Sequence, residues 1–292
     1  MGRLESLAAF VAIADQGSFA GAARALRSSP PAMTRAVAGL EERLGVKLLH
    51  RSTRSVRLTE QGAVFLERCR RLLADLRDAE LGATGETADP HGMLVVTASQ
   101  MLGRLHVVPI VTELLARHAR LDIRLILLDR PIQIVEEGVD VAVRIGDLAD
   151  SALTAVKLGE VRRVLVASPS YLEKHGAPRT PADLRAHSIV AFTGVSATDE
   201  WRFGDAERST VQVKPRLVIN TAGGAIAAVE AGAGIARLLS YQASEGVAAG
   251  RLVHVLDEAA PPPTPINLLF QAARGASPNV RAFVEAAKAR FS

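Results

Sequence analysis

The sequence predicts an α/β protein with three parts: a small helical module with a hairpin, a long linker helix, and a larger region of two α/β lobes. Three patterns support this prediction. Residues 17–59 carry the signals of two short helices, a tight turn and a basic hairpin. Residues 60–83 repeat apolar side chains at spacings of three and four, as in a coiled-coil helix. From residue 93 onward, apolar strands alternate with helices, which is typical of a parallel sheet covered on both faces.

Composition limits the class of protein before any motif is considered. The chain has 292 residues, 48% hydrophobic and 23% charged, which is typical of two or three folded globular units. Cys69 is the only cysteine, so an intrachain disulfide is impossible and a reducing compartment is favoured. The N-terminal apolar run ends at Asp15 without a cleavage site, and no stretch approaches the roughly 18 apolar residues of a membrane span. We therefore expect a cytoplasmic protein.

The N-terminal module is expected to form a helix-turn-helix. Its first helix should run from about Arg3 to Asp15, and Ser18 can cap a short second helix. Ser29 can cap a third helix with Pro30 in its first turn, where no backbone N–H is needed. An inward apolar stripe then follows at spacings of four, three and four, formed by Met33, Val37, Leu40 and Leu44.

The opposite face of this third helix carries small residues and one arginine. It presents Ala32, Thr34, Arg35 and Ala38. Small side chains let a helix approach the floor of a DNA groove, and an arginine can read guanine or hold phosphate. Such a face is typical of a helix that enters the major groove.

Residues 47–59 are expected to form a basic hairpin, or wing, beside that helix. Arg51 and Arg54 are predicted to reach phosphates or a neighbouring minor groove, and Arg57 is a weaker candidate. The alternative is a solvated basic edge that discourages strand aggregation. Charge favours DNA, because residues 1–58 contain nine Lys or Arg and four Asp or Glu, whereas the net charge of the chain is only +4. The predicted DNA-binding residues are Ser29, Pro30, Pro31, Thr34, Arg35, Arg51 and Arg54.

Residues 60–84 are expected to form a helix about 37 Å long, at about 1.5 Å per residue. A helix of that length with one apolar stripe needs a partner, and the simplest partner is the same helix of a second subunit. We therefore predict a two-fold dimer, in which Cys69 is a buried structural thiol and not an exposed redox sensor. The predicted dimerisation stripe consists of Phe65, Cys69, Leu72, Leu76 and Ala79.

Two stretches of the N-terminal module resemble a known family. SFAGAARAL and SPPAMTRAVAGLEERLGVKLLHRSTRSVRLTEQG closely resemble the winged helix-turn-helix of LysR-type transcriptional regulators. One departure is Pro30-Pro31, where many relatives carry one proline beside Gln or Ser, so one side chain that could read a base is absent. The resemblance implies a homodimer or homotetramer, with RNA polymerase as a candidate further partner. Two-fold pairing predicts that double-stranded DNA is bound at an inverted-repeat operator.

The rest of the chain resembles the effector-binding region of the same family, which has the fold of periplasmic binding proteins. RLHVVPIV, EEGVDVAVRIGDLADSAL and EAGAGIARLLSYQ carry this resemblance. It implies a small-molecule effector bound between two lobes. The implied parts are a winged helix-turn-helix at 1–59, a linker helix and hinge at 60–91, and an effector-binding domain at 92–292, with lobe I at about 92–161 and 266–292 and lobe II at about 162–265.

Polar side chains follow several of the predicted strands at their carboxyl ends, where α/β sheets bind ligands. The predicted effector-binding residues are Ser99, Gln100, Arg144, Thr193 and Asn220. Ser99 and Gln100 precede a helix whose N–H groups could hold an anionic effector, such as a small carboxylic acid. Structural alternatives remain open: Ser99 can be a helix cap, Arg144 can pair with Asp147, and Thr193 can be a loop residue.

Catalytic motifs are absent from the sequence. It lacks the G-x-S-x-G turn of α/β hydrolases and the G-x-x-x-x-G-K-[ST] loop that cradles phosphates. Its seven histidines are scattered without metal-ligand spacing, so we expect neither an enzyme nor a metal or other cofactor. The remaining alternative is a solute-binding receptor without a DNA role; the lobes would suit it, but the N-terminal module argues against it.

Overall fold

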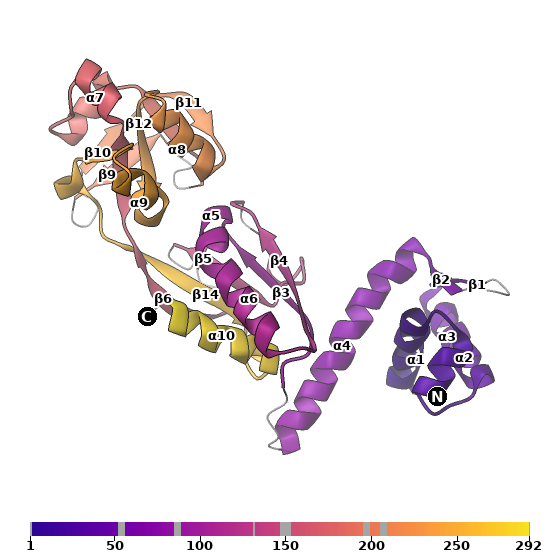
Figure 1. Ribbon diagram of the computed structural model, residues 1–292. Helices are drawn as coiled ribbons and strands as arrows, with labels where there is room; N and C mark the ends of the chain where they lie inside the picture. The colour runs from indigo at the N-terminus through magenta and orange to yellow at the C-terminus, as the bar shows by residue number, and fades with distance from the viewer. Residues whose placement is uncertain are drawn as a thin grey trace. The chain divides into compact units, whose positions relative to one another are not determined.

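Two compact units make up the chain: Met1–Gly92 with Ala276–Pro278, and Met93–Gly275 with Asn279–Ser292 (Figure 1). This computed structural model describes residues 2–51, 56–84, 89–130, 132–146, 153–194, 199–204 and 209–291. Each unit has a hydrophobic core of its own. Among the described residues, no helix is both long and apolar enough to cross a membrane.

The first unit places three short helices before a hairpin and a long helix. Its elements are α1 (Arg3–Gln16), α2 (Phe19–Ala25), α3 (Pro30–Leu44), β1 (Leu49–Arg51), β2 (Val56–Leu58) and α4 (Glu60–Thr84). Both predicted helix caps form. Ser18 Oγ accepts a hydrogen bond from Gly21 N–H at 3.1 Å, and Ser29 Oγ accepts one from Ala32 N–H at 3.4 Å. Gly45 ends α3 with φ of 68°, a left-handed conformation that would strain other residues. The predicted helix-turn-helix with a hairpin is confirmed.

The core of the first unit includes the beginning of the long helix. Phe10 of α1 packs against Phe65 of α4 with ring centroids 5.8 Å apart. The first turns of α4 are therefore part of this small domain. The buried apolar side chains of the core are Ala9, Phe10, Ile13, Ala22, Ala23, Met33, Ala36, Val37, Leu40, Leu48, Leu49, Leu66 and Cys69.

The second unit contains two five-stranded sheets, one in each predicted lobe. Their strand orders are β4-β3-β5-β14-β6 in lobe I and β11-β8-β12-β7-β13 in lobe II. The strands of lobe I are β3 (Gly92–Ala98), β4 (Leu121–Leu127), β5 (Val141–Ile145), β6 (Leu153–Val161) and β14 (Thr264–Gln271). The strands of lobe II are β7 (Arg163–Ala167), β8 (Ile189–Phe192), β11 (Pro215–Ile219), β12 (Ile235–Leu239) and β13 (Val253–Val255), with a separate hairpin of β9 (Glu200–Phe203) and β10 (Ser209–Gln212).

Helices accompany both sheets (Figure 1). Lobe I has α5 (Gln100–Leu102), a π-helical turn (Gly103–Val107), α6 (Val108–Arg117) and α10 (Pro278–Phe291). Lobe II has α7 (Pro169–His175), α8 (Ala222–Glu230) and α9 (Ser240–Ala248). Short 3₁₀ turns lie at Pro181–Ala186, Asp257–Ala259 and Ala272–Arg274.

Both sheets are mixed, so the expectation of parallel sheets is wrong in part. β3 is parallel to β5, and β8 is parallel to β11 and β12. In contrast, β14 is antiparallel to β5 and β6, and β7 is antiparallel to β12 and β13. The reason lies in the connectivity: the chain leaves lobe I along β6 and returns along β14, so these adjacent strands run in opposite directions.

Candidate DNA interface and effector site

The outer face of α3 is the candidate surface for the DNA groove. Thr34 and Arg35 are exposed, whereas Met33 and Val37 lie buried on the other side of the helix. Arg35 forms no hydrogen bond or ion pair with any described residue, so its guanidinium is available to a partner. Thr34 Oγ1 donates to Pro30 O at 3.0 Å, which leaves its oxygen as an acceptor.

The N-terminus of α3 is poor in backbone donors. Ser29, Pro30 and Pro31 are exposed there, but the two prolines carry no N–H. The next two amides are already bonded, since Ala32 N donates to Ser29 Oγ at 3.4 Å and Met33 N donates to Ser29 O at 3.1 Å. Hydrogen bonds from these three residues to phosphate therefore have to come from the side chain or the backbone N–H of Ser29.

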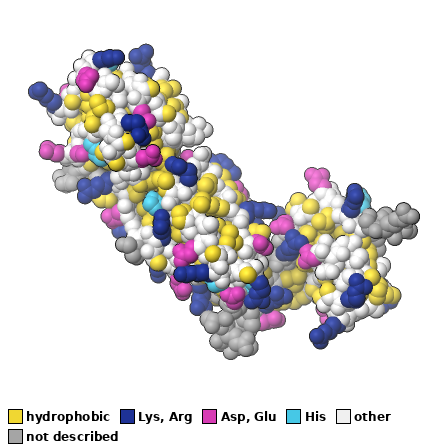
Figure 2. Space-filling model, in the orientation of Figure 1, with side chains coloured by type: hydrophobic (Ala, Val, Ile, Leu, Met, Phe, Trp, Pro, Cys, Tyr) yellow, Lys and Arg dark blue, Asp and Glu magenta, His cyan; other side chains and the backbone are white. Residues whose placement is uncertain are grey.

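The wing begins directly after α3. β1 and β2 pair antiparallel, with Leu49 opposite Leu58 and His50 opposite Arg57. Arg57 is exposed, and Lys and Arg side chains project from the surface of this unit (Figure 2). The side chain of Arg51 and the whole of Arg54 lie outside the described residues.

The predicted dimerisation stripe of α4 divides between two environments. Cys69 is 2% exposed within its own domain core, and burial raises the pKa of its thiol to about 11. Phe65 also packs on that core. In contrast, Leu72 is 48% exposed, and Val64, which the stripe omitted, is 58% exposed. Cys69 is therefore reassigned from the seam to the domain core. Leu76 is half-buried, and the side chain of Ala79 lies outside the described residues.

An open apolar cavity of about 490 Å³ adjoins the exposed part of α4. Leu44 lines it and is 42% exposed, so its predicted place in the inward stripe of α3 is wrong. The physical reason is its position, because Leu44 is the last residue of α3 before the turn at Gly45. The cavity is lined by Leu44, Val46, Leu48, Glu60, Gln61, Val64, Phe65 and Arg68.

In lobe I, an acidic residue already occupies the predicted anion cradle. The N–H of Gln100, at the start of α5, donates to Asp129 Oδ1 at 2.9 Å. Asp129 comes two residues after β4, and the sequence reasoning missed it, although an acid that follows an apolar strand is a usable signal. Ser99 forms no side-chain cap for the helix.

Ser99 instead hydrogen-bonds to Tyr241. Burial raises the pKa of Tyr241 to about 12, although its hydrogen bonds with Gln242 and Ser99 act to lower that pKa.

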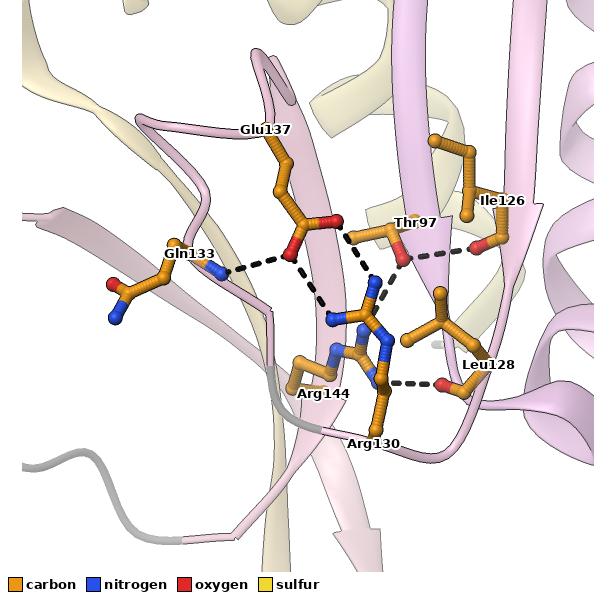
Figure 3. A network of polar contacts seen from close by, with 7 residues as sticks. All are labelled: Thr97, Ile126, Leu128, Arg130, Gln133, Glu137 and Arg144. Carbon is orange, nitrogen blue, oxygen red and sulfur yellow. Dashed lines mark hydrogen bonds and ion pairs between the residues drawn. The ribbon is translucent and has the colours of Figure 1, made fainter.

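Arg144, at the end of β5, is held inside lobe I (Figure 3). Its Nη1 donates to Leu128 O at 2.8 Å and its Nη2 donates to Thr97 Oγ1 at 3.1 Å. Thr97 in turn donates to Ile126 O at 2.8 Å. Burial lowers the pKa of the guanidinium, with a smaller opposing effect from the charge of Asp129. Asp147, the alternative partner named from the sequence, lies outside the described residues.

A second arginine lies beside this one and is paired. Arg130 Nη1 and Nη2 donate to the two carboxylate oxygens of Glu137, each at 3.1 Å (Figure 3). The hydrogen bond from Arg130 lowers the pKa of Glu137. No ion pair within 4 Å joins Arg144 to a carboxylate of the described residues, so Arg144 is the more available cation of the two.

In lobe II, the two predicted residues lie together. Thr193 follows β8 and Asn220 follows β11, and these neighbouring parallel strands end in register, with Ile219 opposite Phe192. Thr193 N donates to Ile219 O at 3.0 Å, which continues the ladder by one bond. Both side chains are exposed. In lobe I, Ala98 lies opposite Val143, so Ser99 and Arg144 likewise leave neighbouring parallel strands.

Comparison with known families agrees with this geometry. Residues 4–63 match the bacterial regulatory helix-turn-helix protein, lysR family, and residues 87–292 match the LysR substrate binding domain. The chain belongs to the LysR family of transcriptional regulators. This LysR-type regulator thus has a DNA-binding helix-turn-helix and an effector-binding domain, in a family of transcription regulators and not of enzymes.

Individual relatives extend over nearly the whole chain. A probable transcriptional regulator LtrA of Klebsiella pneumoniae is 35% identical over 256 residues, 87% of this chain and 83% of that protein. CrgA of Neisseria meningitidis is 31% identical over 282 residues, 96% of this chain and 94% of that protein. The solved structure of CrgA, a LysR-type regulator, aligns over 100% of both chains with a TM-score of 0.64 and 29% identity.

Proposed function

We propose that this LysR-type regulator binds an inverted-repeat operator as a homodimer or homotetramer and changes operator binding, or promoter activation, when a small anionic effector occupies its C-terminal domain. The observation that carries the DNA part is the outer face of α3, where Arg35 stands exposed beside small side chains. Because DNA is the target, the regulator would work in the cytoplasm, and RNA polymerase bound nearby would be a further partner.

Thr34 and Arg35 would contact bases or phosphates in the major groove. Arg51 and Arg54 of the wing would hold the backbone or the adjacent minor groove. Ser29, Pro30 and Pro31 would contact the backbone from the start of α3. In a two-fold dimer these contacts repeat, so half-sites about one helical turn apart are expected.

A second copy of the chain is the proposed partner of the exposed side of α4. Val64 and Leu72 are large apolar side chains that their own chain leaves uncovered. The charges of α4 are unequal along its length: residues 60–71 carry three arginines and two glutamates, whereas residues 72–84 carry three acidic residues and one arginine. An antiparallel pair of helices would bring each basic half against an acidic half.

The anionic character of the effector is supported by Arg144 more than by the start of α5. The amide of Gln100 is bonded to Asp129, whereas Arg144 is half-buried and keeps further N–H groups beyond those bonded to Leu128 and Thr97. A carboxylate can take such a guanidinium in a bidentate pair. Ser99, Thr193 and Asn220 would add hydrogen bonds to the same small molecule.

The deciding experiment measures binding of the full-length chain to a duplex that it selects from randomised DNA. Arg35→Ala is expected to weaken binding to this duplex by about 1–3 kcal/mol. Equal affinity of Arg35→Ala and the unchanged chain at physiological salt would refute the assignment of α3. Failure to select any duplex would refute the proposed inverted-repeat operator.

A further inference from the structure

A buried carboxylate connects the groove-facing helix to the wing. Glu41 lies near the end of α3, and its side chain is 2% exposed. Its Oε1 accepts the N–H of Leu48 at 2.9 Å and the N–H of Leu49 at 3.2 Å, and its Oε2 accepts from Lys47 Nζ at 3.1 Å. A charge is buried at high cost unless polar groups satisfy it. Here, two of those groups are the amides with which the wing begins.

The N-terminus of α4 holds the same segment, residues 47–49, which we call the wing base. Thr59 Oγ1 donates to Lys47 O at 2.7 Å, and Thr59 N donates to Leu48 O at 3.0 Å. The same hydroxyl accepts the N–H of Gly62 at 2.9 Å. A Cβ on Gly62 would lie 2.0 Å from Leu48 O, so only glycine allows this close approach. The wing base is therefore clamped between α3 and α4.

Glu41 also belongs to the side of α3 that faces outward at Thr34. Thr34, Ala38 and Glu41 are spaced by four and three residues, so Glu41 and Thr34 differ by roughly 20° around the helix axis. Thr34 and Ala38 are exposed, whereas Glu41 is covered. Since Glu41 bonds to the wing base, the wing begins at the end of the helix stripe that would approach DNA.

We propose that Glu41 is a positioning residue for DNA binding, because it fixes the direction of the wing relative to α3. The wing arginines and Arg35 can then contact one duplex at the same time. This inference rests on the proposed function, in which both groups touch DNA. Charge alone predicts the opposite result. A carboxylate repels phosphate, so removing Glu41 should strengthen DNA binding if the residue acts only through its charge.

The test compares Glu41→Ala with Glu42→Ala in the full-length chain. Glu42 is the next residue of α3 and is exposed, so both changes remove one negative charge from the same helix end. Affinity for the selected duplex is measured from low to physiological salt. Glu41→Ala is expected to bind about tenfold more weakly and to lower the salt slope by about one, because a wing phosphate contact is lost. Glu42→Ala should bind as well as the unchanged chain or better.

Three further variants separate positioning from folding. Glu41→Gln returns an acceptor oxygen to the two amides and is expected to recover most of the affinity. In an Arg51→Ala background, the cost of Glu41→Ala should shrink, whereas in an Arg35→Ala background it should persist. A purely structural role would give the same cost in both backgrounds.

The proposal is overturned if Glu41→Ala binds as tightly as Glu42→Ala, or if it binds weakly with an unchanged salt slope. Should Glu41→Ala fail to fold by circular dichroism, Thr59→Val replaces it, since it loosens the wing base from α4. If Thr59→Val folds and its DNA affinity has the same salt slope as that of the unchanged chain, then holding the wing base does not position the wing for DNA. If Arg35→Ala and Arg51→Ala themselves have no effect, the proposed function fails instead.

Discussion

Arg144 uses two of its N–H donors inside its own lobe before any ligand is present. The sequence could place it at the end of a strand, because an apolar run precedes it. Its hydrogen-bond partners could not be predicted, because Leu128 is 16 residues and Thr97 is 47 residues distant in the sequence. The same limit explains why Glu41 was missed, since it accepts backbone amides that only the folded chain brings close.

Arg144→Met should lower the free energy of unfolding by about 1–3 kcal/mol, because Leu128 O and Thr97 Oγ1 lose a charged donor. Urea unfolding followed by circular dichroism would measure it. Arg124→Met is the matched control, since Arg124 is exposed on β4 in the same sheet. Equal unfolding midpoints for the two variants would show that the Arg144 hydrogen bonds contribute nothing.

Cys69 should resist alkylation by iodoacetamide at pH 8 in the native chain and react after denaturation. Its folded pKa is raised by burial from 9.0 to about 11, so almost no thiolate exists at that pH. Because the folded-state pKa is the higher one, the contribution of Cys69 to the free energy of unfolding is complete below pH 9. It is lost as the pH rises from 9 to 11, where the folded chain still holds a proton that the unfolded chain has released. Mass spectrometry of the alkylated protein is the measurement. Rapid native modification would mean that the thiol is accessible.

At the scale of elements, α4 shows what periodicity does and does not predict. The spacing of apolar residues correctly indicates one long helix. It does not indicate which neighbour each side chain meets, because one apolar band can serve two partners. Phe65 packs on Phe10 of its own domain, whereas Leu72 remains exposed. Only the path of the chain through α1 and α3 decides where the domain core ends and the free surface of α4 begins.

Val64→Asp should weaken the proposed dimer by tenfold or more, because it places a charge in the apolar contact between two α4 helices. Sedimentation equilibrium would give the dissociation constant. Ala63→Asp is the matched control: Ala63 is also exposed, but it lies on the polar side of α4 near Glu67. If both variants dissociate equally, or neither does, the exposed side of α4 is not the dimer contact.

At the scale of the whole molecule, composition and motif order were sufficient to predict a helix-turn-helix before an α/β effector region. The strand directions were not predictable in the same way. β14 pairs with β5 and β6 although more than 100 residues separate them, and Asn267 reaches Gly146 across 121 residues. Such pairings depend on which strand returns to which sheet, and local sequence patterns carry little of that information.

A fragment of residues 92–292 should fold alone and bind no DNA, because the second unit has its own cores and the outer face of α3 is absent. Thermal unfolding by circular dichroism and binding to the selected duplex would test both points. If the fragment still bound the selected duplex, the second unit would contact DNA, which contradicts the assignment of DNA binding to α3.

Asp129 has a consequence for which molecules can act as a signal. Its carboxylate belongs to the same chain and accepts the amide of Gln100, so a free acid that binds there competes with an intramolecular group at high effective concentration. A simple monoacid would seldom displace it from this amide. We therefore expect the acid group of an effector to pair with Arg144 and to leave the amide of Gln100 to Asp129.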